Sequence, residues 1–236
     1  MKCIAIIPAR GGSKRIPRKN IRPFAGRPII EYPITAALAA GCFDEVMVST
    51  DDVEIAEVAK KAGASVPFMR SAKNSNDHAT TADALIEVIE KYKESRRVFD
   101  LGCCIYPFAA LVTPERLREG LQIMCTQPGL NGVVPVLRFG YPIQRALRIK
   151  DDLLDMIDQR HQNTMSQDLE PAYHDSGQYY WFRVGALFQA RTLLGPKVAP
   201  ILLSEMEAQD IDNEDDWHLA ELKYQMRQAK SKRFHD

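Results

Sequence analysis

The sequence lacks an excess of charge of either sign, because its 236 residues include 31 basic and 31 acidic side chains. This balance argues against a protein whose whole surface is committed to nucleic acid or to an anionic membrane. Long apolar runs are also missing. The N-terminal run CIAIIP is too short for a signal peptide, and no later window approaches the length of a membrane span. We therefore expect a soluble protein with neither a nucleic-acid nor a membrane partner.

Cysteine is scarce, and its five occurrences form no C-x-x-C pair and no zinc spacing. Most of them lie in apolar runs, where a free cysteine behaves as a small buried hydrophobe. The pair Cys103-Cys104 is accordingly expected in the core rather than acting as a nucleophile. A reducing, cytoplasmic compartment is the location that this cysteine usage favours.

The common nucleotide motifs are absent too. Neither G-x-x-x-x-G-K-[ST] nor G-x-G-x-x-G occurs, so the sequence indicates neither a P-loop kinase nor a protein that binds a dinucleotide. No Ser/His/Asp or Cys/His arrangement suggests nucleophilic catalysis.

What the sequence does contain is an alternation of short apolar runs with amphipathic stretches. Strands are expected at 3–8, 46–50, 65–68, 101–106 and 133–137, and helices at 28–40, around 55–59, at 81–92, after Thr113-Pro114 and at 214–227. Pro33 conflicts with the first of these helices unless that helix starts later than residue 28. The alternation predicts an α/β fold with a mostly parallel central sheet flanked by helices, in which ligands bind at the carboxyl ends of the strands.

Residues 137–175 break this alternation, because the stretch is polar and has no convincing period. We interpret it as an excursion from a single domain that covers residues 1–236. The aromatic run QYYWF at 178–182 then predicts a strand that returns to the core.

The loop at 10–20 directly follows the first predicted strand. It contains Gly11-Gly12, a serine, an asparagine and five basic side chains within eleven positions. Adjacent glycines let the backbone approach an anion with successive N–H groups, and basic side chains supply the charge that a triphosphate requires. A solvated basic turn is the alternative, but the position after a buried N-terminal strand favours a phosphate site.

Five segments carry a resemblance to a known family. They are IIPARGGSKRIPRKNI, STDDVEIAEVAKKAGA, FMRSAKNSNDHATTAD, SQDLEPAYHDSGQYYWF and AQDIDNEDDW. Together they resemble the CMP-sialate synthetase-like cytidylyltransferases over nearly the whole chain. The block at 167–182 is most similar to the branch of that family that activates pseudaminic acid. The resemblance implies a nucleotide-diphospho-sugar transferase-like (Rossmann-like) fold, and a homodimer in which 137–175 forms a protruding dimerisation arm.

The reaction that the resemblance implies is transfer of CMP from CTP to the anomeric hydroxyl of a nine-carbon 2-keto acid sugar, with release of pyrophosphate. Legionaminate, sialate or Kdo remain alternative sugars, and a catalytically silent nucleotide-binding protein is the alternative from another class. No side chain stands out as the general base.

The resemblance also implies roles for individual residues. The CTP phosphates would be held by Arg10, Gly11, Gly12, Ser13, Lys14, Lys19 and Asn20, and the cytosine by Arg70, Ala79, Thr80 and Thr81. Thr80 followed by Asp83 also fits a capping box that starts the next helix, and both roles can hold at once.

Asp210 and Asp212 fall on the family's metal site. Two carboxylates separated by one residue lie on the same side of an extended segment, which suits a Mg²⁺ ion that also binds phosphate oxygens. The alternative is that Asp212 caps the helix that follows. Arg10, Lys19 and Asp210 are the expected catalytic residues. Asp51 and Asp52 are explained by capping of the helix that follows them.

The sugar end is the least defined part of the predicted site. The resemblance places Tyr106, Gln167, Asp168, Tyr173, Gln178 and Tyr180 there. Ordinary strand packing is the alternative for 179–182. The sequence departs from the family at Phe108 and Ala110, in a turn that usually reads Pro-Thr-(Ala/Ser)-Pro, and at Met165, where a basic residue is expected.

Overall fold

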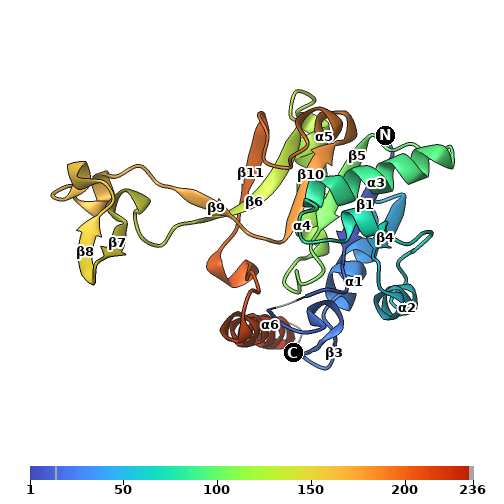
Figure 1. Ribbon diagram of the computed structural model, residues 1–236, viewed down its shortest axis with the longest axis horizontal. Coiled ribbons are helices and arrows are strands. Elements are labelled where there is room, and N and C mark those ends of the chain that lie inside the picture. The colour runs from blue at the N-terminus through green and yellow to red at the C-terminus, as the bar shows by residue number, and fades with distance from the viewer. Residues whose placement is uncertain (14, 234–236) are drawn as a thin grey trace.

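The computed structural model describes residues 1–13 and 15–233, with side chains up to residue 229. It shows a core built on one sheet and an arm that projects from it (Figure 1). In the described part of the chain, no helix is long and apolar enough to cross a membrane.

The central sheet is mostly parallel, as the sequence predicts. Its strands lie in the order β11 (Val198–Leu202), β6 (Gly132–Arg138), β10 (Tyr179–Arg183), β5 (Leu101–Ile105), β1 (Cys3–Pro8) and β4 (Glu45–Ser49), with β9 (Tyr173–Asp175) paired to β6. β10 is antiparallel to both of its neighbours, β5 and β6. The aromatic strand expected at 178–182 therefore returns between two strands that run in the opposite direction.

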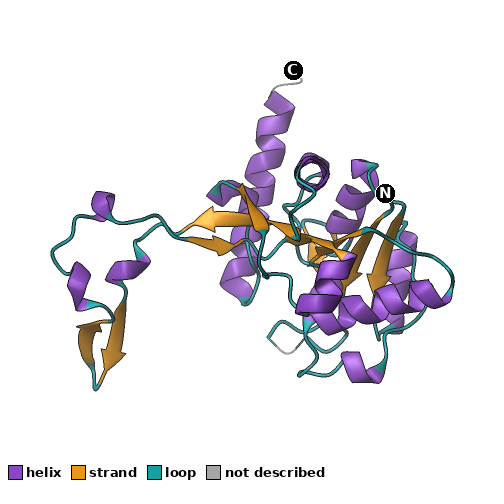
Figure 2. Cartoon of the chain, turned by 90° about the horizontal axis from the view of Figure 1, so that it is seen from above, coloured by secondary structure: helices purple, strands orange, loops and turns teal. Residues whose placement is uncertain are grey.

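Helices cover both faces of the sheet (Figure 2) because consecutive side chains of the buried strands point to opposite sides. On β1, Ala5 and Ile7 pack against α1 (Glu31–Ala40), α2 (Val53–Lys61) and α4 (Pro114–Thr126). Ile4 and Ile6 pack on the other face, where α3 (Thr81–Glu94) and α5 (Val184–Ala190) lie. The predicted helices at 28–40, 55–59 and 81–92, and the one after Thr113-Pro114, all form with shifted ends.

Two local expectations change. Helix α1 begins at Glu31, so Pro33 lies in its first turn, where an N–H group has no partner within the helix. The strand expected at 65–68 is wrong, because only Ser65 bridges to Met47 of β4 and the chain then leaves the sheet. The segment Ser-Val-Pro-Phe at 65–68 is short, and Pro67 has no N–H group to donate to a neighbouring strand.

The last helix, α6 (Glu214–Arg233), packs on the small hairpin of β2 (Pro23–Phe24) and β3 (Arg27–Pro28). Trp217 and Tyr224 meet the Phe24 ring edge to face, with ring centroids 5.6 and 5.8 Å away. This packing brings the segment before α6 next to the N-terminal loop.

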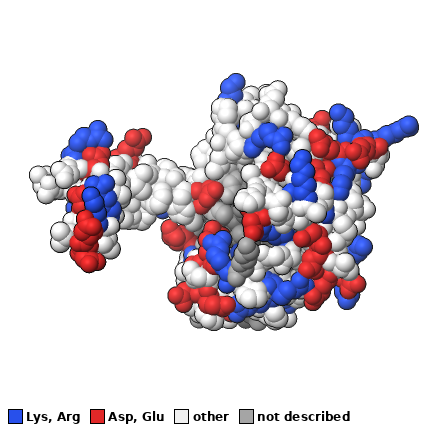
Figure 3. Space-filling model, in the orientation of Figure 1, with Lys and Arg blue, Asp and Glu red and all other residues white. Residues whose placement is uncertain are grey.

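The arm leaves the core at Arg138 of β6 and returns at Tyr173 of β9, which are paired with each other. At its far end β7 (Leu147–Lys150) and β8 (Leu153–Met156) form an antiparallel hairpin, flanked by the single turns η3 (Ile143–Arg145), η4 (Gln159–His161) and η5 (Ser166–Asp168). Figure 3 shows the arm standing apart from the rest of the surface.

Candidate active site

A cavity of about 550 Å³ opens at the carboxyl ends of β1, β4 and β5, where a parallel sheet places its ligands. Its wall comes from the N-terminal loop, the segment that leads into α3 and the turn after β5. It is lined by Pro8, Arg10, Ser13, Arg15, Lys19, Asn20, Arg70, Asn74, Asn76, Asp77, Ala79, Thr80, Thr81, Ala84, Tyr106, Pro107 and Phe108.

Most of the predicted phosphate residues meet at this cavity. Arg10, Ser13, Lys19 and Asn20 line it, and the Asn20 side chain donates to the Arg10 carbonyl at 2.9 Å, which fixes the turn of the loop. Gly11 and Gly12 adjoin these residues, and the Gly11 N–H donates to Asp51 at 3.0 Å. Lys14 lies outside the described residues.

Asp52 holds the same loop from the other side. Its carboxylate caps α2 through the Ile55 N–H and pairs with Arg18, and the Arg18 hydrogen bond lowers the pKa of Asp52. A Cβ on Gly11 would lie 2.6 Å from the Asp52 Oδ2, so any larger residue there would displace the Asp52 side chain. The capping role expected for Asp52 is therefore present, and it also shapes the loop.

Lys19 links the loop to the distant segment before α6. Its Nζ donates to the Ile211 carbonyl at 2.6 Å and lies 3.9 Å from the centroid of the Phe108 ring. Burial lowers the pKa of Lys19, while Asp212 and Asp210 act in the opposite direction. A partly desolvated ammonium group of this kind interacts strongly with an incoming phosphate.

Arg70 is buried at the end of β4. Its Nε donates to the Ser49 Oγ at 3.0 Å, its guanidinium group also donates to the Ser49 carbonyl, and its backbone N–H donates to the Thr50 carbonyl at 2.8 Å. Ala79, Thr80 and Thr81 line the same cavity. Thr80 and Asp83 form the expected capping box, so the start of α3 is both a cap and a polar edge of the cavity.

Asp210 and Asp212 lie beside Lys19. Asp212 pairs with Arg15 at 2.7 Å, and Asp210 accepts from the Ile211 N–H at 2.9 Å. Burial, and then the Asp212 charge, raise the pKa of Asp210. Gly177 packs against Asp210 with φ of 62°, and a Cβ there would lie 3.0 Å from the Asp210 Cγ.

Helix α6 is capped by Asn213, not by Asp212. The Asn213 Oδ1 accepts from the Asp216 N–H at 3.0 Å, and Asp216 accepts in return from the N–H groups of Asp212 and Asn213. The capping interpretation of Asp212 is therefore wrong, and its carboxylate instead pairs with the Arg15 guanidinium group.

A pair of carboxylates fits Mg²⁺, which takes one or two carboxylates and completes its shell with water or phosphate oxygens. Within residues 1–13 and 15–233, no larger group of His, Cys, Asp or Glu is arranged to hold a metal.

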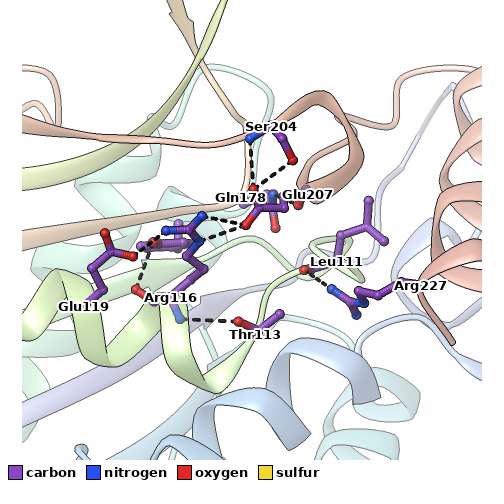
Figure 4. A network of polar contacts seen from close by, with 9 residues as sticks. Leu111, Thr113, Arg116, Glu119, Gln178, Ser204, Glu207 and Arg227 are labelled. Carbon is purple, nitrogen blue, oxygen red and sulfur yellow. Dashed lines mark hydrogen bonds and ion pairs between the residues drawn. The ribbon is translucent and has the colours of Figure 1, made fainter. Parts of the chain in front are cut away.

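A network of polar contacts holds the segment that leads to Asp210 (Figure 4). Arg116 of α4 contacts Glu207 at 2.8 Å, and Glu207 accepts from Ser204, which caps the turn η6 (Glu205–Glu207). Gln178, next to β10, donates to the Glu207 carbonyl at 2.7 Å. Arg227 of α6 donates to the Leu111 carbonyl, shortly before α4, at 2.6 Å. The chain before Asp210 is thus tied to α4 and β10.

A family model described as cytidylyltransferase matches residues 4–215. The chain belongs to the cytidylyltransferase family. It is 38% identical over 227 residues to a pseudaminic acid cytidylyltransferase of Campylobacter jejuni, covering 96% of this chain and 97% of that protein. It is 32% identical over 232 residues to the CMP-N,N'-diacetyllegionaminic acid synthase of Legionella pneumophila, covering 94% and 95% of the two chains.

The fold is shared with a CMP:2-keto-3-deoxy-manno-octonic acid synthetase solved in complex with CTP. The TM-score is 0.70 at 19% identity, and the match covers 97% of this cytidylyltransferase and 100% of the other chain.

Of the predicted sugar residues, only Tyr106 lines the cavity of this cytidylyltransferase. Its ring stacks on Phe108 with centroids 5.4 Å apart and meets Tyr180 edge to face at 5.6 Å. The Tyr180 hydroxyl donates to Asp175 at 2.8 Å. Gln178 is 2% exposed, and its Oε1 has no hydrogen-bond partner among the described residues. Strand packing therefore accounts for most of the aromatic run at 179–182.

Gln167 and Asp168 lie elsewhere, on η5 in the arm, and Tyr173 is exposed where the arm rejoins the sheet. Gln167 lines a second cavity of about 510 Å³ near the base of the arm, together with Tyr141 and Leu169. These three predicted sugar residues do not meet the first cavity within one chain.

Several cavity residues were missed from the sequence. Asn74, Asn76 and Asp77 lie between Arg70 and Ala79, and Arg10 contacts Asp77 at 3.0 Å. The polar run KNSND inside the quoted block was the available signal. Phe108, noted only as a departure, forms one wall together with Tyr106.

Proposed function

We propose that this cytidylyltransferase transfers CMP from CTP to the anomeric hydroxyl of pseudaminic acid, giving CMP-pseudaminate and pyrophosphate. The observation that carries the proposal is that the basic loop, the segment from Arg70 to Thr81 and the turn after β5 enclose one cavity. Identity to pseudaminic acid cytidylyltransferases over nearly the full length supports this choice of sugar over legionaminate, sialate or Kdo.

The mechanism asks for positioning and charge stabilisation rather than covalent catalysis. The sugar hydroxyl attacks the α-phosphorus, and negative charge accumulates as pyrophosphate leaves. Arg10 and Lys19, which lie at the same cavity, neutralise that charge, while Ser13 and Asn20 orient the phosphates. Arg70 and Ala79–Thr81 hold the cytosine.

Asp210 and Asp212 would hold a Mg²⁺ ion beside Lys19. When bound, the ion would supply charge neutralisation on the phosphates and acidify the attacking hydroxyl. The two carboxylates and their position next to the Lys19–Ile211 contact support this assignment.

The arm supports the proposal of a homodimer. The exposed fractions of Ile149, Leu153 and Leu154 at its far end are 76%, 72% and 70%, and Tyr141, Ile143, Leu147 and Ile157 are also exposed. A second copy of the chain would cover this surface and place Gln167 and Asp168 near the partner's cavity. We also propose a cytoplasmic location, which the five free cysteines support.

A pyrophosphate-release assay with CTP, Mg²⁺ and a panel of acid sugars tests the function. We expect turnover with pseudaminic acid and a kcat/KM at least about tenfold lower with legionaminic acid, sialic acid and Kdo. If another sugar is turned over and pseudaminic acid is not, the chain is a cytidylyltransferase for that other sugar. Absence of turnover with every sugar, while CTP still binds, would support the alternative of a silent nucleotide-binding protein.

A further inference from the structure

The segment between Arg70 and Thr81 has almost no regular structure of its own. Apart from the turn η2 (Ala72–Asn74), it runs as a loop to the start of α3, beginning beside the end of β4, where the Arg70 N–H donates to the Thr50 carbonyl. The position of a loop is set by side-chain contacts, because it lacks the backbone ladder of a helix or strand. The contacts that hold this loop therefore decide how well it fits a nucleotide base.

Glu87, on the second turn of α3, makes several of these contacts. Its Oε1 accepts from the Ser71 N–H at 2.8 Å, and its Oε2 accepts from the Ser71 Oγ at 2.7 Å and the Asn74 Nδ2 at 2.5 Å. Only 9% of the residue is exposed. Burial by itself would raise the pKa of Glu87, but hydrogen bonds from Lys91, Ser71 and Asn74 lower it to about 2.

Lys91 lies one helical turn after Glu87 and completes the arrangement. Its Nζ contacts Glu87 Oε1 at 2.9 Å and donates to the Met69 carbonyl at 2.9 Å. Met69 and Ser71 are the residues directly before and after Arg70. The Glu87–Lys91 pair thus holds the backbone on both sides of Arg70, with the carboxylate on one side and the ammonium group on the other.

We propose that Glu87 and Lys91 form a positioning pair that sets the fit of the Arg70–Thr81 segment to cytosine and so determines the preference for CTP over other nucleotides. Neither residue lines the nucleotide cavity, so the pair acts through Arg70 and Asn74. The inference rests on the proposed function, in which this segment recognises the base.

The contacts of the loop with Arg10 involve a group that the nucleotide would use. Arg10 donates to the Asn76 carbonyl at 3.3 Å and pairs with Asp77, and a bound triphosphate would compete for its guanidinium group. The contacts with Glu87 and Lys91 involve α3 rather than the phosphate residues, and they would persist with CTP bound. Because the Glu87 carboxylate is charged and largely buried, its hydrogen bonds to Ser71 and Asn74 are stronger than ordinary surface hydrogen bonds.

The test compares Glu87→Gln and Lys91→Met with Glu90→Gln, a matched control on an exposed position of the same helix. Pyrophosphate release is measured with CTP and with UTP at saturating sugar. For Glu87→Gln and Lys91→Met we expect the KM for CTP to rise about tenfold, kcat to stay within about twofold and the CTP:UTP ratio of kcat/KM to fall about tenfold. Glu90→Gln should match the wild type.

The inference is overturned if folded Glu87→Gln keeps the wild-type KM for CTP and the wild-type CTP:UTP ratio of kcat/KM, whether or not its kcat falls. If Glu87→Gln does not fold, Lys91→Met decides by the same criteria. Isothermal titration calorimetry with CTP in the absence of sugar measures the Kd for CTP, and this measurement separates the inference from the proposed function. A wild type that binds CTP but turns over no sugar contradicts the proposed function, and a roughly tenfold weaker Kd in the variants still supports the positioning pair.

Discussion

Gly11 illustrates how single residues determine the shape of the phosphate loop. A Cβ at this position would meet the Asp52 side chain, which is already fixed as the cap of α2 and by Arg18. At the neighbouring Gly12, a Cβ would have no heavy atom within 4 Å among the described residues, its two chain neighbours aside. The two adjacent glycines, which are equivalent in the sequence, therefore have different structural requirements.

We predict that Gly11→Ala lowers the free energy of unfolding by about 1–2 kcal/mol, because Asp52 must give up its cap of α2. Gly12→Ala is the matched control and should change it by less than about 0.5 kcal/mol. Thermal and urea denaturation of the two variants measure the difference. Equal stability of both would contradict the steric argument.

At the metal site, we predict that Asp210→Asn lowers kcat at least about a hundredfold with Mg²⁺, because one of two carboxylates is lost. Asp215→Asn, in the exposed first turn of α6, should retain wild-type activity. Chelation of divalent ions should abolish wild-type turnover, and added Mg²⁺ should restore it. Unchanged turnover by Asp210→Asn would show that Asp210 does not hold the metal.

Much of the nucleotide side of the site could be predicted at this scale. Arg10, Lys19 and Arg70 are charged residues in recognisable segments, and the structure brings them to one cavity. Glu87 could not be predicted, because a glutamate in an amphipathic helix is usually a solvent-exposed residue and its partners Ser71 and Asn74 are 13 to 16 positions away.

At the scale of elements, α3 begins at the edge of the cavity. The Thr80 Oγ1 accepts from the Asp83 N–H at 3.1 Å, and the Asp83 Oδ2 accepts from the Thr80 N–H at 3.1 Å. These bonds satisfy N–H groups that have no partner within the helix. The same helix carries Glu87 and Lys91, which contact Ser71 and Met69. Helix α3 therefore holds both ends of the Arg70–Thr81 segment.

We predict that Thr80→Ala destabilises the protein by about 1 kcal/mol through loss of the cap, while Thr80→Ser, which keeps the hydroxyl, has a much smaller effect. Chemical denaturation measures both changes. Because Thr80 also lines the cavity, the KM for CTP of Thr80→Ser shows separately whether the methyl group contacts the nucleotide. Equal stability of the alanine and serine variants would mean that the capping box contributes nothing.

Element types were easier to predict than pairing. The runs at 3–8, 101–106 and 133–137 were continuous and apolar, and they form buried strands. The antiparallel insertion of β10 between β5 and β6 could not be predicted, because strand order depends on contacts between residues far apart in the chain. The hairpin β7–β8 was also missed, since its apolar side chains are exposed and show no single buried face.

At the scale of the whole molecule, the arm separates Gln167 and Asp168 from the cavity of their own chain. If a partner's arm completes each site, two defective chains can restore one another. We predict that Asp168→Asn and Asp210→Asn homodimers are both weakly active, whereas dimers re-formed from their mixture recover about a quarter of the wild-type activity. Denaturation and joint refolding, followed by pyrophosphate release, measure this recovery.

The control for this prediction is the oligomeric state. Light scattering should give about twice the 26.6 kDa mass of one chain, and Ile149→Glu should lower it toward the monomer whereas Asp151→Asn should not. A monomeric wild type at micromolar concentration would contradict the dimer. A dimer without recovery in the mixture would show that the arm serves assembly alone.

The contact between Lys19 and the Ile211 carbonyl has a consequence for synthesis of the protein. It joins residues 192 positions apart, and Arg22 and Glu214 make a second contact of the same span at 2.6 Å. A nascent chain that has not yet emerged from the ribosome beyond residue 214 has the phosphate loop but neither contact. Since domains form their long-range contacts only after the required segments are available, we infer that the nucleotide site is assembled only after residues 211–214 have been synthesised, and that chains terminated before residue 211 are inactive.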